Sequence, residues 1–207
     1  TPLPAPNPSP APIPTPNPNP VTIPFVQYFE KIAIDGLQSI PADNTISNTW
    51  GGNQTKITRH DDGTIRMVYL VRGATPAQMI WRVMKRDPTT KVWAQEATGK
   101  TTDNVHLVRN PVTDQAIVVT WLNSIPTVYV SPNYTPFSIP GSWQILTSAS
   151  RHYDGVGIGA DGTLCLKAVH QLTTTADTET QYTCGKYSIT TNDWTWSPFL
   201  VKNIGER

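Results

Sequence analysis

Apolar residues between Thr64 and Phe199 occur in short runs, and residues that favour turns separate these runs. The stretch from Thr64 to Trp93 shows the pattern most clearly. Two runs rich in β-branched and aromatic residues flank a polar break, and a turn then leads into a third run. Such runs, bounded by Gly, Pro, Asp and Thr, predict antiparallel β-strands. Because no run approaches the ~20 apolar residues of a membrane-spanning helix, no transmembrane segment is predicted.

The same unit returns along the chain with a period of about 50 residues, which is typical of β-propeller blades when each unit has about four strands. The landmarks of a unit are a tight turn, a second strand, a third strand and a closing tryptophan. The expected turns are Asp62-Gly63, Thr113-Asp114 and Asp161-Gly162, and the second strands begin at Ile65, Ala116 and Leu164. The third strands lie near Met79–Arg86, Thr127–Ser131 and Gln181–Ser188. The closing tryptophans are Trp50, Trp93, Trp143 and Trp194.

We therefore predict an all-β, propeller-like domain over residues 21–207, with about 3.5 to 4 four-stranded blades of about 50 residues. Three arrangements are compatible with this length: a small ring completed by the terminal segments, part of a larger propeller, or two chains that complete each other's edge. Continuous apolar runs such as Ile117-Val118-Val119 predict strands that are buried on both faces. The tryptophans Trp93, Trp143 and Trp194 are expected to fill the wedges between blades.

Residues 1–20 differ from the rest of the chain, because proline occupies every even position from Pro2 to Pro20. Proline fixes φ and disfavours a helical conformation in the residue before it, so this segment is predicted to be a polyproline II rod of about 60 Å. It is either a semi-rigid spacer or a segment that docks into an aromatic groove of a protein partner or neighbouring subunit.

The charge balance argues against nucleic acid and anionic membranes as partners, because the net charge is +1 and only 15% of the residues are charged. No signal peptide is visible at the start of the sequence. The two cysteines, Cys165 and Cys184, lie on predicted neighbouring strands. They are expected to form a cross-strand disulfide, which would place the protein in an oxidising compartment, secreted or at the cell surface; the alternative is two buried thiols.

Two turn motifs resemble those of known propeller families. Asp87–Trp93 and Ser188–Trp194 are similar to the turn and tryptophan that close a kelch repeat. Asp87–Trp93 and Asn192–Trp196 also resemble the Asp-box (BNR) turn of sialidase-type propellers, Ser-x-Asp-x-Gly-x-x-Trp. The resemblance covers roughly residues 40–200 and implies a β-propeller fold.

The sialidase resemblance also implies a site in which three arginines surround a carboxylate. Arg59, Arg109 and Arg151 lie on or just before predicted innermost strands, one in each unit, and are candidates for such a cluster. The alternative is that they are surface arginines at strand ends.

Aromatic residues are the stronger candidates for ligand binding. Exposed rings stack on sugars or on proline-rich segments, and Trp81, Trp121, Tyr129 and Tyr134 are the candidates for such rings. His60, His106 and His152 are evenly spaced, but they differ in distance from the turn of their unit. We therefore predict no metal site and no cofactor.

Together these observations favour an exported, non-catalytic module that holds a protein or glycan partner and is tethered or docked through its proline-rich segment. One alternative is a fragment of a sialidase-like glycoside hydrolase. The other is a structural subunit of a filament or a large extracellular complex.

Overall fold

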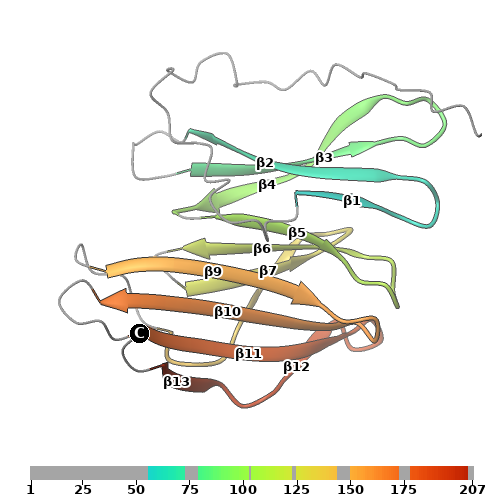
Figure 1. The fold of residues 1–207 in the computed structure, drawn as a ribbon. Helices are drawn as coiled ribbons and strands as arrows, with labels where there is room; N and C mark the ends of the chain where they lie inside the picture. Colours follow the sequence, from blue (N-terminus) through green and yellow to red (C-terminus); the bar gives the residue numbers. More distant parts are fainter. Residues whose placement is uncertain are drawn as a thin grey trace, which may run out of the picture. The chain divides into compact units, whose positions relative to one another are not determined.

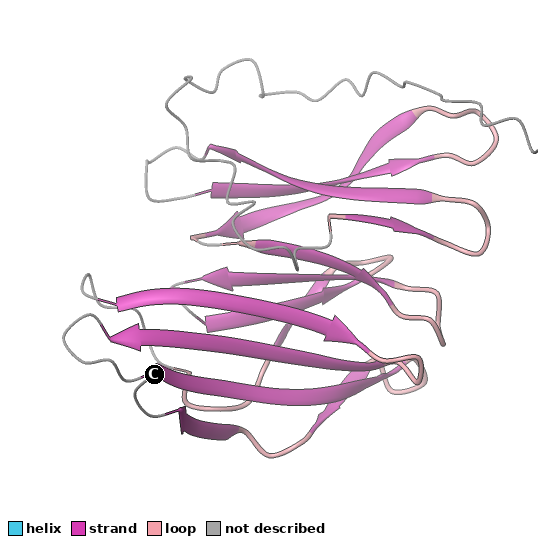
Figure 2. Ribbon diagram, viewed as in Figure 1, coloured by secondary structure: helices cyan, strands magenta, loops and turns pink. Residues whose placement is uncertain are grey.

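The computed structural model describes residues 56–72, 79–102, 104–122, 125–143, 150–172 and 178–204, all within the compact unit Ala33–Arg207. These residues form thirteen strands in three antiparallel sheets (Figures 1 and 2), which confirms the all-β prediction. The polyproline segment and the unit that ends at Trp50 lie outside the described residues.

Sheet A corresponds to the first complete unit and has the order β1-β2-β3-β4. Its strands are β1 (Ile57–Arg59), β2 (Ile65–Arg72), β3 (Met79–Arg86) and β4 (Trp93–Thr101). The turn before β2 forms where predicted. Gly63 adopts a φ of 83°, which glycine tolerates without strain, and the Asp62 carboxylate accepts hydrogen bonds from the backbone N–H and hydroxyl of Thr64.

Sheet B has the order β5-β6-β7-β8. Its strands are β5 (Val105–Arg109), β6 (Ala116–Leu122), β7 (Ile125–Val130) and β8 (Thr135–Ser138). The second strand begins at Ala116 as predicted. The third runs from Ile125 to Val130 rather than from Thr127 to Ser131. It ends before Ser131 because the carbonyl of Val130 accepts the N–H of Tyr134 at 2.9 Å and closes a turn.

Sheet C has the order β12-β11-β10-β9, with β13 also paired to β11. Its strands are β9 (Ser150–Ile158), β10 (Thr163–Leu172), β11 (Thr178–Ser188), β12 (Asp193–Trp196) and β13 (Leu200–Ile204). β10 begins one residue before the predicted start at Leu164, and β11 begins at Thr178 rather than Gln181. β12 and β13 pair with successive parts of β11, so sheet C has one strand more than the other sheets.

The predicted disulfide is present. Cys165 in β10 and Cys184 in β11 are direct register partners, and their sulfur atoms are bonded. Cys165 is exposed and Cys184 is half-buried, so the bond lies on the face of sheet C that is turned away from the core.

Sheet B packs against a neighbouring sheet with each of its faces, through two clusters of apolar residues. The cluster between sheets A and B, here the A/B seam, contains Val68, Leu70, Trp81, Val83, Val105, Leu107, Ala116, Val118 and Tyr134. The cluster between sheets B and C, the B/C seam, contains Val108, Ile117, Val119, Trp121, Val128, Val130, Ile139, Trp143, Leu164, Leu166, Ala168 and Trp194. Alternate residues of β6 enter opposite seams, which confirms that this apolar run is buried on both faces.

The turns that follow the first strand of each sheet contact one another in succession. His60 Nδ1 lies 2.8 Å from the carbonyl oxygen of Asp114, and the N–H of Asp61 donates to the Asp114 carboxylate. A Cβ on Gly162 would lie 2.9 Å from Asn110 Oδ1, so these two turns also lie close together. These contacts fix the order of the sheets, although the described residues do not close a ring.

The closing tryptophans are not structurally equivalent. Trp194 lies in β12 and Trp143 follows β8, and both are buried in the B/C seam. Trp93 opens β4, is half-buried and belongs to neither seam of the described residues. The unit that precedes it lies outside the described residues, so its role in filling a wedge stays a prediction.

Among the described residues, no helix has the length and hydropathy that a membrane span requires.

Candidate functional site

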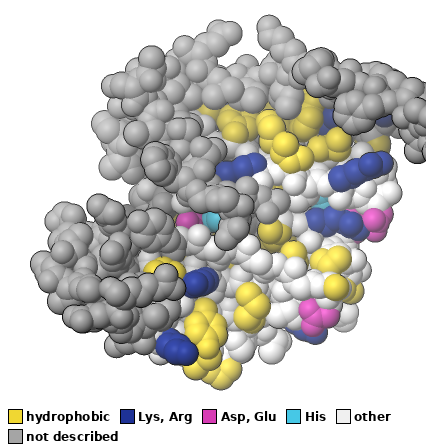
Figure 3. Space-filling view, viewed as in Figure 1, with side chains coloured by type: hydrophobic (Ala, Val, Ile, Leu, Met, Phe, Trp, Pro, Cys, Tyr) yellow, Lys and Arg dark blue, Asp and Glu magenta, His cyan; other side chains and the backbone are white. Residues whose placement is uncertain are grey.

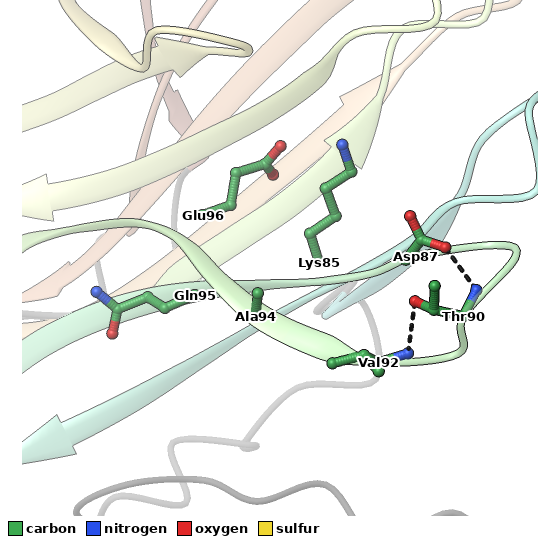
Figure 4. A pocket seen from close by; sticks show the side chains of 7 residues that line it. All are labelled: Lys85, Asp87, Thr90, Val92, Ala94, Gln95 and Glu96. Atoms are coloured by element: carbon green, nitrogen blue, oxygen red, sulfur yellow. Dashed lines mark hydrogen bonds between the residues drawn. The ribbon is translucent and has the colours of Figure 1, made fainter.

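A pocket of about 410 Å³ lies on the hairpin formed by β3 and β4 (Figure 4). This volume falls within the usual range of small-ligand sites. Its lining contains one cation, two carboxylates, an amide, a hydroxyl and two small apolar side chains. The lining residues are Lys85, Asp87, Thr90, Val92, Ala94, Gln95 and Glu96.

Asp87 shapes the turn end of the pocket. Its Oδ1 accepts hydrogen bonds from the backbone N–H groups of Thr89 and Thr90 at 2.8 and 2.7 Å. The hydrogen bond from the Thr90 N–H, followed by that from Thr89, lowers the pKa of the Asp87 carboxyl below its usual value. This carboxylate therefore holds the loop and stays ionised at neutral pH.

Glu96 enters the pocket through a β-bulge. Val83 pairs with Ala97 and Met84 with Gln95, so Glu96 is the extra residue of β4. A bulge redirects a side chain, and the Glu96 carboxylate reaches the outer end of the A/B seam. There it accepts hydrogen bonds from Arg66 and Tyr134.

The network around Glu96 joins sheet A to sheet B. Arg66 donates from Nε at 2.7 Å and from Nη2 at 3.0 Å, and the Tyr134 hydroxyl donates at 2.8 Å. Burial alone would raise the pKa of Glu96, but the hydrogen bonds from Arg66 and Tyr134 outweigh burial and lower it. Burial raises the pKa of the Tyr134 hydroxyl, which therefore stays protonated as the donor.

Two polar groups of the pocket have no hydrogen-bond partner among the described residues: the Lys85 ammonium, whose charge helps to lower the pKa of the Asp87 and Glu96 carboxyls, and the Gln95 side-chain amide. Figure 4 shows the Lys85 side chain extending to the same side of the hairpin as the Glu96 carboxylate. The pocket thus offers unused hydrogen-bonding groups beside carboxylates that are already bonded.

The four aromatic residues predicted to be exposed lie mainly in the core. Trp81 is 1% exposed and packs edge-on against Tyr129, with ring centroids 5.0 Å apart, and Trp121 is fully buried. Tyr134 is also buried. The expectation of exposed rings is therefore wrong for Trp81, Trp121 and Tyr134, because sheet B is covered on both faces; Tyr129 is half-buried.

A different set of rings, which the sequence did not suggest as ligand-binding residues, reaches the surface at the outer end of the B/C seam. We define the aromatic row as Phe137, Tyr187, Trp194 and Trp196. Successive ring centroids along it are 5.9, 5.5 and 4.9 Å apart. Trp194 is buried and the other three rings are half-buried. The alternation of Trp194 and Trp196 along one strand was the available signal for this row, because alternate residues share a face.

The three predicted arginines occupy different environments. Arg59 is exposed beside the turn that ends β1. Arg109 forms ion pairs with Asp61 and Asp114 beside the turn that ends β5. Arg151 lies near the start of β9, at the opposite end of a first strand, and its side chain is outside the described residues.

His106 belongs to a buried polar cluster between the start of β5 and the middle of β9. Its Nε2 lies 2.5 Å from Asp154 Oδ2, and Asn104 donates to Asp154 Oδ1 at 2.8 Å. Lys56 donates to the carbonyl of Val105. Burial lowers the pKa of the Lys56 ammonium to about 8, although Asp154 opposes the shift. Both oxygens of the carboxylate are engaged, so this cluster connects β5 to β9.

Of the other two evenly spaced histidines, only His60 has a described side chain. His60 is buried and bonded to Asp114, and the side chain of His152 is outside the described residues. Among the described residues, no group of three or more His, Cys, Asp or Glu side chains is placed to hold a metal ion.

Comparisons with protein-family models, with curated proteins and with solved structures found no match.

Proposed function

We propose that this protein is a non-catalytic binding module that acts outside the cytoplasm and holds a glycan in the β3–β4 pocket. The observation that carries the proposal is the pair of unused groups, the Lys85 ammonium and the Gln95 amide, in a pocket large enough for a small ligand. A neutral, polyhydroxylated ligand fits best. The charges of Lys85 and Arg66 balance those of Asp87 and Glu96, so the pocket has no strong excess of either sign.

The carboxylates of the pocket favour binding over hydrolysis. A glycoside hydrolase needs one carboxyl group that stays protonated near neutral pH to act as a general acid, and enzymes achieve this by raising its pKa. Here the pKa values of both Asp87 and Glu96 are lowered. Both groups also have hydrogen-bond partners that hold them in structural roles.

The experiment is to measure binding of the full chain to an array of neutral and acidic oligosaccharides. We expect binding to neutral members, and a loss of at least about tenfold in affinity in the Lys85→Ala/Gln95→Ala variant, since each lost polar contact weakens binding. Lys100→Ala, an exposed residue of β4 outside the pocket, is the control for charge. Binding that survives in the double variant, or release of reducing sugar by the wild type, would overturn the proposal.

The extracytoplasmic location is supported by the Cys165–Cys184 disulfide, because such bonds persist mainly in oxidising compartments. Localisation of the tagged protein in its native cells would test it. A cytoplasmic protein with two free thiols would contradict this part of the proposal.

We also propose that the three sheets are successive blades of a propeller-like fold, in line with the kelch-like and Asp-box-like turns. Support comes from the repeated strand order, the packing of sheet B between its neighbours, and the contacts between first-strand turns. A crystal structure in which β1, β5 and β9 do not surround one axis would refute this arrangement.

A further inference from the structure

The aromatic row is an uncharged surface that the proposed glycan site does not use. Its rings come from two sheets: Phe137 lies in β8, Tyr187 in β11, and both tryptophans in β12. Phe137, Tyr187 and Trp196 remain partly accessible. Aromatic side chains in such rows provide large, weakly polar contact areas, and Trp and Tyr commonly dominate protein interfaces.

Contacts within sheet C order the rings of the row. A Cβ on Gly185 would lie only 2.5 Å from the Trp196 ring, so the indole rests directly on the backbone of β11. The same indole stacks on Trp194 at an interplanar angle of 18°. The Tyr187 hydroxyl donates to Asn192 Oδ1 at 2.5 Å. Because these rings are already ordered, little conformational entropy is lost when a ligand covers them.

The chain itself contains a segment with the matching chemistry. Residues 1–20 include no Asp, Glu, Lys or Arg, and proline occupies every even position. A polyproline II segment is extended before it binds, and recognition modules commonly take up such segments on aromatic side chains. The uncharged segment and the uncharged rings would bury no unpaired charge on contact.

We propose that the aromatic row binds the proline-rich segment, residues 1–20, of a second copy of this chain. Proline-rich linkers act as semi-rigid spacers, and this property suits such a segment to bridging two molecules. A contact in which the segment of one copy meets a different surface on the next is heterologous, and it allows assemblies to grow with concentration.

The test is sedimentation velocity of the full chain across a range of concentrations. We expect concentration-dependent self-association, which a synthetic peptide of residues 1–20 disrupts and a peptide with alanine at the proline positions does not. Trp196→Ala should weaken association about tenfold or more, as expected for a central aromatic contact. Trp93→Ala, a half-buried tryptophan outside the row, should leave association unchanged.

Three results would overturn the proposal: a wild type that stays monomeric at high concentration, association that persists in a folded Trp196→Ala variant, or assemblies that the proline peptide leaves intact. If Trp196→Ala fails to fold, Phe137→Ala at the other end of the row replaces it, with the same expected loss. Because the readout is self-association without any sugar, failure here is distinguishable from failure of the glycan proposal.

Discussion

The two seams of the molecule have the same apolar interior but differ at their outer ends. The A/B seam ends in a charged network, in which Glu96 of β4 holds Arg66 and the Tyr134 hydroxyl. The B/C seam ends in the aromatic row. Hydrogen bonds to a carboxylate depend on its ionisation, whereas contacts between aromatic rings carry no titrating charge. One repeated architecture therefore carries two surfaces with different chemistry.

The difference also separates the two proposed sites. The polar end lies beside a pocket with unused hydrogen-bonding groups. The aromatic end offers rings without charge.

On the face shown in Figure 3, apolar side chains form separate patches between Lys and Arg side chains, so no single large apolar patch of described residues dominates it.

We predict the largest loss of folding stability for a substitution in the core of the B/C seam. Trp121 is fully buried and packs edge-on against Trp143, with ring centroids 5.5 Å apart. Trp121→Ala should lower the free energy of unfolding by about 3–5 kcal/mol, because it removes a buried ring and leaves a cavity. Urea denaturation measures this change. The half-buried Trp93 is the comparison, and Trp93→Ala should cost below about 2 kcal/mol; equal losses would mean that the assigned seam is wrong.

The charged end of the A/B seam should respond to Glu96→Gln. The amide keeps the shape of the side chain but removes the charge that balances Arg66, and both side chains are mostly buried, at 16% and 11% exposed. We expect a loss of about 1.5–3 kcal/mol, the range for hydrogen bonds to charged groups. Thermal or urea unfolding measures it.

The control for Glu96→Gln is an exposed ion pair. Lys186 and Asp161 are 59% and 60% exposed, so Lys186→Met should cost below about 1 kcal/mol. If Lys186→Met loses as much unfolding free energy as Glu96→Gln, burial does not make the A/B network stronger than a surface ion pair.

Two glycines make a matched test of how rigid each end is. A Cβ on Gly99 would lie 2.5 Å from the Trp81 ring, and one on Gly185 equally close to the Trp196 ring. Trp81 is buried and has no room to move, so Gly99→Ala should cost about 1–3 kcal/mol. Trp196 is half-buried and can shift outward, so Gly185→Ala should cost below about 1 kcal/mol. Melting temperatures of the two variants measure this difference, and a larger drop for Gly185→Ala than for Gly99→Ala would contradict it.

The smallest predicted effect is the pH dependence of the stability that the Glu96 network contributes. The folded-state pKa of Glu96 is lowered, so its contribution to stability is fully present above the unfolded value of about 4.3 and is lost as pH falls through the folded value. The stability difference between wild type and Glu96→Gln should therefore shrink below about pH 4.3. Urea midpoints from pH 7 to pH 3 measure this, and a constant difference would contradict the lowered pKa.

Local signals predicted much of the fold. The Asp-Gly turns at Asp62 and Asp161 and the apolar run of β6 depend on neighbouring residues alone, and they appear where expected. The disulfide followed from the placement of two cysteines on adjacent strands. In each case the sequence pattern and the physical cause lie within one hairpin.

The candidate site depends on contacts that the sequence does not display. The bulge at Glu96 is stabilised by Arg66 and Tyr134, which lie 30 and 38 residues away. Likewise, nothing local distinguishes the buried Trp121 from the accessible Trp196. Their exposure is decided by which faces of each sheet are covered, and that follows only from the packing of sheet B between the other two.

The most direct test of two chemically distinct sites is a nuclear magnetic resonance titration of the ¹⁵N-labelled full chain, with neutral oligosaccharides and the peptide of residues 1–20 added separately. We predict that the sugar perturbs amides of residues 85–96 and that the peptide perturbs amides of residues 185–199 and Phe137. If both ligands perturb the same amides, or neither perturbs its predicted set, the two ends of the seams are not separate binding sites.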